Sequence, residues 1–226
     1  MIAVVDADIL VYRFGFASEG DPAEFALARL SEFLDELYTK LDVDDIIGYM
    51  TGKGNFRDEI AVTAPYKGNR TGNAKPYHFG LLREYMEKSW NFEVVDGMEA
   101  DDALGIYAYS HEPEEYVLVT IDKDLDMIRG HHYGFVKEEK YYITEEEGIR
   151  NFYLQILTGD KVDNIMGLKG IGPVKAKRIL EKCETETEMY KAVVDAYEGN
   201  LERVWENAQL LWILRKPNQI WMPPNL

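Results

Sequence analysis

Cysteine and long apolar runs are nearly absent from this chain of 226 residues. The single cysteine, Cys183, excludes an intramolecular disulfide and is expected to be a small buried side chain, as in proteins of a reducing compartment. No apolar run approaches the roughly 18 residues that a membrane span needs, and Asp6 comes too early for a signal peptide. We therefore expect a soluble, cytoplasmic protein with no membrane partner. A hydrophobic content of 46% predicts that it buries a real core.

Positive charge is also scarce, because 25 Lys and Arg face 41 Asp and Glu for a net charge of −16. This total argues against a nucleic-acid partner, since cation–phosphate contacts supply most non-specific affinity. The distribution argues otherwise: residues 51–75 hold five basic and two acidic side chains, and residues 161–182 hold six and two. Two basic stretches on an acidic body are compatible with an enzyme that holds nucleic acid at defined points.

Short apolar runs alternate with helical patterns in the first two thirds of the chain. The runs predict buried parallel strands over residues 1–5, 45–50 and 116–121. The helical patterns cover residues 22–41, 77–90 and 100–110. This alternation predicts an α/β fold with a doubly wound, mostly parallel sheet. Ligands of such sheets bind beyond the carboxyl ends of the strands.

After about residue 149 only helical patterns remain, which predicts an α/β core over residues 1–150 and a helical subdomain over residues 151–226. Residues 66–76 contain glycines, a proline and several cations, so we expect an exposed loop that is mobile without ligand. The tail holds three tryptophans to which we assign helix packing and no chemistry: Trp205, Trp212 and Trp221.

Eight carboxylates form four clusters, each at the expected end of a strand or helix. Gathered carboxylates repel and raise each other's pKa, so a fold that collects them needs divalent cations. Oxygen ligands without nearby His or Cys favour Mg²⁺ or Mn²⁺ over zinc. A cluster of this size predicts two ions, and two-metal sites commonly catalyse in-line attack on a phosphodiester. The carboxylates are Asp6, Glu99, Asp101, Asp102, Asp122, Asp124, Asp160 and Asp163.

Two of the clusters also have an ordinary structural interpretation. The acids of residues 99–102 could cap a helix, although one would be enough for a cap, and Glu99 and Asp102 can share a helical face. The acids of residues 122–124 could belong to a polar turn. Their joint occurrence with Asp6 at another strand end favours a metal site over these alternatives.

Two basic elements have functional interpretations. Tyr66, Lys67 and Arg70 could face a phosphodiester transition state and stack on a base, or could simply be solvated surface. Glycines followed by Pro173 predict a tight turn and a helix start that binds phosphate without reading bases, although a plain helix connection is the alternative. The candidate DNA-binding residues of this second element are Gly167, Lys169, Gly170, Gly172 and Lys175.

Together these motifs resemble the 5′-nuclease family of flap endonucleases, polymerase 5′ nuclease domains and phage 5′→3′ exonucleases. The resemblance is collinear from residue 1 to about residue 182. It implies a PIN-like 5′-nuclease core and a helix–hairpin–helix-like element of the helix-three-turn-helix kind, and the short chain favours a phage-type stand-alone exonuclease. The motifs lie at residues 5–6, 66–70, 99–102, 120–124, 159–164 and 167–172.

The resemblance also implies residue roles. One ion would be surrounded by Asp6, Glu99, Asp101 and Asp102, and the other would lie near Asp122, Asp124, Asp160 and Asp163. Lys67, Arg70 and Arg13 would face the scissile phosphate at the base of an arch that single strands thread, with Tyr66 beside them. Asp6 and Asp124 would join Lys67 and Arg70 as catalytic residues. A K⁺ ion is implied at Gly167, Gly170 and Gly172.

One departure from the family concerns the second strand, which usually ends in an aspartate. Here Thr51 or Gly52 takes that place. We expect that a water or Asp58 replaces the ligand, or that the first ion is held more loosely.

The sequence thus predicts a two-metal, structure-specific 5′→3′ exonuclease and flap endonuclease of phage DNA replication or genome degradation. We expect a monomer that acts on DNA 5′ ends, flaps or RNA–DNA hybrids in the cytoplasm of an infected bacterial host. A catalytically weakened DNA-junction-binding protein of the same fold is the main alternative. A small ribonuclease of the related toxin type is less favoured, because such proteins lack the glycine hairpin.

Overall fold

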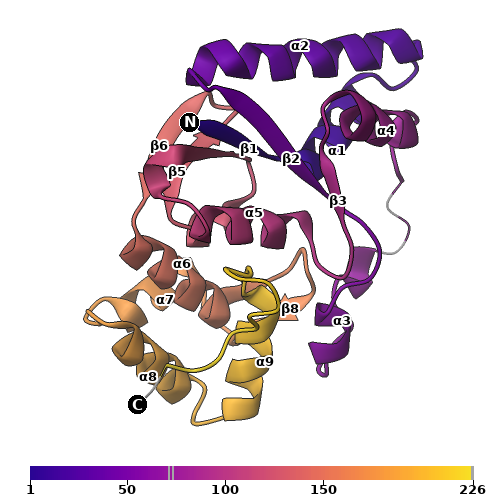
Figure 1. The fold of residues 1–226 in the computed structure, drawn as a ribbon. Coiled ribbons are helices and arrows are strands. Elements are labelled where there is room, and N and C mark those ends of the chain that lie inside the picture. The colour runs from indigo at the N-terminus through magenta and orange to yellow at the C-terminus, as the bar shows by residue number, and fades with distance from the viewer. Residues whose placement is uncertain (71, 73, 225–226) are drawn as a thin grey trace.

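The computed structural model describes residues 1–70, 72 and 74–224 and contains a six-stranded mixed sheet (Figure 1). The strand order is β3-β2-β1-β4-β5-β6. The first five strands are parallel, and only β6 runs antiparallel to its neighbour. Their bounds are β1 Ile2–Asp6, β2 Asp45–Thr51, β3 Glu93–Val95, β4 Tyr116–Val119, β5 Gly130–Gly134 and β6 Glu139–Ile143. The predicted mostly parallel sheet is confirmed.

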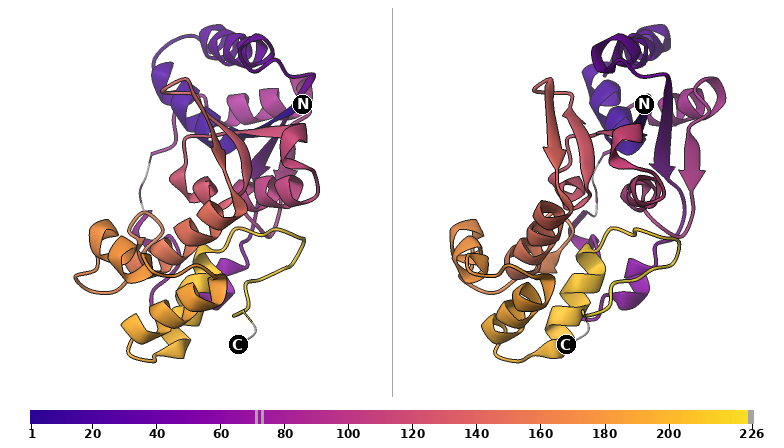
Figure 2. Two further views of the ribbon diagram at one scale, coloured as in Figure 1. Left: turned by 90° about the vertical axis from the view of Figure 1, so that its left-hand side faces the viewer. Right: turned by 60° about the vertical axis from the view of Figure 1, so that its left-hand side comes forward.

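Helices cover both faces of this sheet (Figures 1 and 2). Successive side chains of a strand point to opposite faces, so in β1 Ala3 and Val5 join one apolar core and Val4 joins the other. Helices α1, α2 and α4 pack on the first core, and α5 and α6 contribute to the second. Their bounds are α1 Ala7–Ala17, α2 Ala23–Leu41, α4 Phe79–Ser89, α5 Ala100–Tyr109 and α6 Glu145–Thr158.

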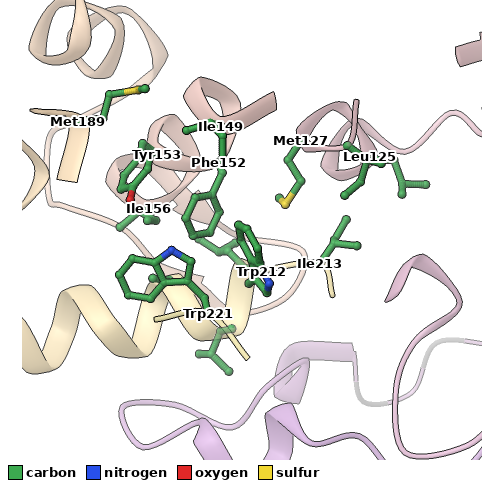
Figure 3. Close-up of a cluster of buried hydrophobic side chains, with 14 of the residues drawn as sticks. Leu125, Met127, Ile149, Phe152, Tyr153, Ile156, Met189, Trp212, Ile213 and Trp221 are labelled. Atoms are coloured by element: carbon green, nitrogen blue, oxygen red, sulfur yellow. The ribbon is translucent and has the colours of Figure 1, made fainter. Parts of the chain in front are cut away.

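The C-terminal part is mainly helical and packs against α6 (Figure 2). It contains α7 Pro173–Leu180, α8 Glu186–Ala196 and α9 Leu201–Leu211. Aromatic rings fill its core (Figure 3): the ring centroids of Phe152 and Trp212 lie 5.0 Å apart, and Trp221 is also buried. Trp205 is instead 40% exposed and donates its indole N–H to the Tyr190 hydroxyl.

Two expectations about chain organisation need correction. Strands do occur after residue 149, because β7 Gly159–Asp160 and β8 Ile165–Met166 form a short antiparallel hairpin. The predicted division between residues 150 and 151 falls inside α6 rather than between elements.

Shorter elements complete the chain: α3 Arg57–Ile60 and 3-10 turns at Gly68–Arg70, Pro113–Glu115 and Lys123–Met127. In the described part of the chain, no helix has the length and apolar character of a membrane span.

The topology brings several chain segments to one edge of the sheet. β1 lies between β2 and β4, and the order reverses between β1 and β4. Ligands of open α/β sheets bind at such a switch point, beyond the carboxyl ends of the strands. Asp6 ends β1, Thr51 ends β2, and Asp122 follows β4, so this edge collects the predicted acids.

Candidate active site

A cleft of about 650 Å³ opens at this edge of the sheet. The structure brings seven of the eight predicted carboxylates to its wall, together with the three predicted cations of the scissile-phosphate site. The carboxylates are Asp6, Glu99, Asp101, Asp122, Asp124, Asp160 and Asp163. The cations are Arg13, Lys67 and Arg70. Residues separated by more than 150 positions in sequence therefore share one concave surface.

Capping interactions hold several of these acids in place. Asp6 is the N-cap of α1, and its other oxygen accepts a hydrogen bond of 3.1 Å from the Thr120 hydroxyl. Asp122 caps the following 3-10 turn by accepting from the Asp124 N–H at 2.9 Å. Asp124 in turn accepts a hydrogen bond from the side-chain amide of Gln155 on α6. Acids at helix starts are favourable for their own helices, so the local fold alone accounts for their placement but not for their convergence.

The crowding of charge is visible in the acid–base properties of the cleft. Burial, followed by the charges of Asp8 and Asp122, raises the pKa of Asp6 to about 7. Burial and then Asp122, Asp160 and Asp163 raise the pKa of Asp124 to about 8. The pKa of Asp101 is also raised, by burial and by the neighbouring acids. The cleft thus holds more negative charge than its own cations neutralise.

The predicted cations contact the acids directly. The Lys67 ammonium pairs with Glu99, and the Arg70 guanidinium pairs with Asp163. The Tyr66 hydroxyl lies 2.9 Å from both of these carboxylates. The Lys67 backbone N–H also donates to the Asp163 carbonyl at 2.9 Å, in a left-handed conformation with φ of 52°. This unusual backbone conformation and the tether direct the basic segment into the cleft.

The donor set matches a hard divalent cation, because all seven candidate ligands are carboxylates and the cleft contains no His or Cys among its lining residues. Among the described residues, however, no three such side chains converge tightly enough to coordinate an ion as they stand. Lys67 and Arg70 occupy oxygens of Glu99 and Asp163 instead. The residues fit a metal site in charge and chemistry, and ion binding requires side-chain rotation within the cleft.

Asp102 is the predicted ligand that the structure places elsewhere. Its two oxygens form a bidentate pair with Arg57, at 2.6 and 2.8 Å, and the side chain is fully buried. It also accepts hydrogen bonds from the backbone N–H groups of Glu99 and Leu214. With these partners its oxygens are satisfied away from the cleft, so the predicted metal role of Asp102 is replaced by a structural one.

Asp102→Asn is expected to lower the free energy of unfolding by about 3 kcal/mol, because removing one partner of a buried ion pair leaves the other charge uncompensated. The affinity of the folded variant for Mn²⁺ should stay within about two-fold of wild type. Urea unfolding and Mn²⁺ titration check this, with Asp101→Asn in the cleft as the matched variant. Unchanged stability together with weakened Mn²⁺ binding would mean that Asp102 is a metal ligand, as the sequence predicted.

The cleft includes residues that the sequence reasoning missed. Asp8, Tyr12 and Phe16 line it. Asp6-Ala7-Asp8 has the same Asp-x-Asp spacing as residues 122–124, and this spacing was the signal that could have identified Asp8. The two aromatic residues carry no comparable signal, because apolar residues on the first helix are equally typical of a core.

The structure shows which residue occupies the end of β2, where the family usually has an aspartate. Thr51 lines the cleft, and its hydroxyl accepts a hydrogen bond of 2.9 Å from the Ala100 N–H at the start of α5. Gly52 cannot carry a side chain without rearrangement, since a Cβ there would lie 2.1 Å from a carboxylate oxygen of Asp96. Asp58 is exposed on α3 and does not line the cleft, so the predicted replacement by Asp58 is wrong.

The glycine hairpin lies outside this cleft. Pro173 is the first residue of α7, as predicted, and Gly170 has φ of +79°, which favours glycine. Gly167 serves close packing instead, because a Cβ there would lie 2.2 Å from the Thr158 carbonyl carbon. Lys169 and Lys175 are exposed, and the Lys175 ammonium donates to the Gly170 carbonyl at 2.8 Å. Both cations are therefore available at the protein surface.

Comparison with protein-family models gives no match. The chain is 31% identical over 204 residues to the thermostable DNA polymerase I of Thermus aquaticus, which covers 80% of this chain and 24% of the polymerase. It is 27% identical over 218 residues to the 5′-3′ exonuclease of Buchnera aphidicola, covering 85% and 74%. The flap endonuclease of bacteriophage T5, solved with DNA and metal ions, has a TM-score of 0.76 at 17% identity, covering 93% and 88%.

The sheet order, the helices on both faces and the acidic cleft at the strand ends define a PIN-like α/β fold of the nuclease class. Within this class, the chain belongs to the 5′-nuclease family. It spans about a quarter of the length of the thermostable polymerases that it matches.

In EDTA, we expect the free energy of unfolding to fall as the pH rises from 6.5 to 8.5. The raised pKa values of Asp6 and Asp124, about 7 and 8, mean that the folded state holds protons that the unfolded chain has already released. A raised carboxyl pKa stabilises the fold at low pH, and this contribution is lost as the pH passes the folded pKa.

The loss amounts to about 1.4 kcal/mol per proton and pH unit. The lowered pKa of buried His132 acts in the opposite direction, and this contribution fades as the pH rises above the ordinary histidine value of about 6.5. Melting temperatures in EDTA at pH 6.5, 7.5 and 8.5 test the prediction. A constant or rising profile would contradict the crowding of charge in the cleft.

Proposed function

We propose that this chain is a metal-dependent, structure-specific 5′→3′ exonuclease and flap endonuclease that hydrolyses DNA phosphodiester bonds with two divalent ions, Mg²⁺ or Mn²⁺. The observation that carries the proposal is the convergence of seven carboxylates with Lys67 and Arg70 in one cleft at the strand ends. Four of these carboxylates, Asp122, Asp124, Asp160 and Asp163, come from other turns than Asp6 and the α5 start that carries Glu99 and Asp101, so local structure alone does not explain their meeting.

We divide the acids into two groups by the elements that carry them. Asp6, Glu99 and Asp101 lie on the β1 and α5 side and would hold one ion, and the remaining carboxylates would hold the other. The second group is Asp122, Asp124, Asp160 and Asp163. Bound ions would activate a water and stabilise the leaving oxygen, which is the chemistry that two-metal sites supply.

The cations have a separate task. Lys67 and Arg70 lie at the same cleft and, once released from Glu99 and Asp163, would neutralise the charge that develops on the phosphate. Arg13, which is exposed on α1 and lines the same cleft, would contact the same phosphate. Tyr66 positions the acids through its hydroxyl, whereas its ring packs against the hydrophobic core and does not line the cleft, so we do not propose the predicted stacking on a base. The arch proposed over residues 66–76 includes Thr71 and Asn73, which lie outside the described residues.

The surface around the hairpin would hold duplex DNA. We propose that the start of α7, with Gly167, Gly170 and Gly172, forms a helix–hairpin–helix-like phosphate site that can also hold K⁺. The chain would then act as a monomer in phage DNA replication, for example in primer removal, or in genome degradation, within the bacterial cytoplasm. We propose that the helical part after α6 contacts duplex DNA and that the sheet with its flanking helices carries the nuclease chemistry.

Lys169→Ala with Lys175→Ala is expected to weaken duplex binding while leaving the single-turnover rate at saturating enzyme unchanged. Each lost phosphate contact should reduce the slope of log K against log salt by up to about 0.9. Binding isotherms between 50 and 200 mM NaCl measure the slope, with Lys191→Ala on α8 as control. An unchanged slope would show that the two lysines beside the hairpin do not contact DNA phosphates.

Digestion of labelled substrates tests the proposed activity. A 5′-flap DNA, a blunt duplex, a single strand and an RNA–DNA hybrid are incubated with Mg²⁺, Mn²⁺ or Ca²⁺. We expect cleavage of flap and duplex ends near the 5′ terminus and slower cleavage of the isolated single strand. Binding of junction DNA with no cleavage in any metal would instead support the catalytically weakened junction-binding protein.

A further inference from the structure

Of the three described strands whose ends meet at the cleft, β1, β2 and β4, only β2 has no acid at its end or directly after it. β1 ends in Asp6 and β4 is followed by Asp122, whereas β2 ends in Thr51. The Thr51 hydroxyl is occupied in capping α5 through its hydrogen bond from the Ala100 N–H. A carboxylate nevertheless reaches this point, because Asp8 accepts a hydrogen bond of 3.0 Å from the Thr51 backbone N–H.

The Asp8 carboxylate is fixed from two sides. Its second oxygen accepts a hydrogen bond of 3.0 Å from Arg83 on α4, and the other terminal nitrogen of Arg83 donates to the Thr51 carbonyl at 2.7 Å. The side chains of Asp8 and Arg83 are only 28% and 20% exposed. An acid in the first turn of a helix needs no such partners, because the helix dipole already favours it.

Two hydrogen bonds leave acceptor capacity on this carboxylate, since an ionised carboxylate offers about four lone-pair sites. Asp8 lines the same cleft as Asp6 and Asp101, and Gly52 and Asp58 cannot serve this position. We propose that Asp8 supplies the carboxylate at the β2 end of the cleft and helps to hold a divalent cation there, with Arg83 and the Thr51 peptide positioning it. This inference rests on the proposed metal-dependent function.

Binding of Mn²⁺ alone tests the role of Asp8 without any nuclease assay. Free Mn²⁺ is measured by electron paramagnetic resonance during titration of wild type, Asp8→Asn and the control Asp58→Asn. The control removes the same charge from an exposed acid outside the cleft. Asp8→Asn should weaken the tightest site by about 10-fold or more, and Asp58→Asn should bind within two-fold of wild type.

Moving the carboxylate from position 8 to position 51 distinguishes a metal ligand from a merely structural residue. Recovery of Mn²⁺ affinity is expected only if Asp8 acts as a ligand. Asp8→Asn combined with Thr51→Asp returns an acid to the end of β2, and a carboxylate at position 51 can still accept from the Ala100 N–H. This double variant should bind Mn²⁺ within about three-fold of wild type. If Asp8→Asn alone does not fold, the double variant decides the question.

The outcomes separate the two proposals. Equal Mn²⁺ affinity of wild type and Asp8→Asn, or no recovery in a folded double variant, overturns the role of Asp8 and leaves the metal site itself intact. A wild-type protein that binds no Mn²⁺ overturns the proposed metal site and the role of Asp8 together. Weakened binding by Asp8→Asn and recovery by the double variant support both.

Discussion

Asp124→Asn is expected to lower the single-turnover rate of DNA cleavage by about 10²–10³-fold while leaving DNA binding in Ca²⁺ near the wild-type value. Asp124 lies in the cleft, where burial and then the neighbouring acids raise its pKa to about 8. A metal ion stabilises transition-state charge by several kcal/mol, so a lost ligand costs about this much rate. Rapid-quench cleavage of a 5′-flap substrate measures it.

Asp126→Asn is the matched control, because Asp126 lies in the same 3-10 turn, accepts a hydrogen bond from the Tyr141 hydroxyl and does not line the cleft. The two variants should also differ in stability. Without metal and above pH 8, Asp124→Asn should melt at a higher temperature than wild type, since it removes a partly buried repelling charge. Cleavage by Asp124→Asn at the wild-type rate would exclude Asp124 from the reaction.

Lys67→Ala is expected to lower the single-turnover rate by roughly 10²-fold or more with little change in substrate affinity. A cation whose interaction strengthens as charge develops acts on the transition state rather than on substrate binding. In the structure Lys67 is already in the cleft, paired with Glu99 and tied through its backbone to Asp163. Equilibrium binding and saturating single-turnover rates on the same flap substrate separate the two effects.

Lys53→Ala is the control for Lys67→Ala, because Lys53 is an exposed cation of the same basic stretch that does not line the cleft. It should leave both quantities within about two-fold of wild type. If Lys67→Ala weakens binding but cleaves at the wild-type rate once saturated, the ammonium serves substrate binding only, and its proposed role at the scissile phosphate is wrong.

The central strands could be predicted from the sequence because helices bury both of their faces. All residues of β4 are buried, and such a strand reads as a continuous apolar run. The sheet edges give no such signal: β3 has three residues, two of them exposed, and β6 carries polar residues on an open side. Strand β5 contains two histidines, and His132 is buried by stacking on Tyr141 across the strand pair.

The active-site residues, like the strands, could be predicted only in part from the sequence. Acids that recur at the ends of parallel strands could be predicted to meet, because the topology brings those ends together. The role of Asp102 could not be predicted, since its partner Arg57 lies 45 residues away and a capping acid looks the same in sequence whichever way its oxygens point. Asp8 was missed for the converse reason, because an acid in a first helical turn is ordinarily explained by the helix itself.

The most direct test of the account is the metal dependence of cleavage by the intact chain. A 5′-labelled flap DNA is incubated with excess enzyme in EDTA, and Mg²⁺ is then added over EDTA. We predict no cleavage in EDTA and hydrolysis near the 5′ end after Mg²⁺ is added, abolished again by Asp124→Asn. Cleavage that continues in EDTA, or DNA that stays intact at every Mg²⁺ and Mn²⁺ concentration, would contradict a two-metal nuclease centre in the acidic cleft.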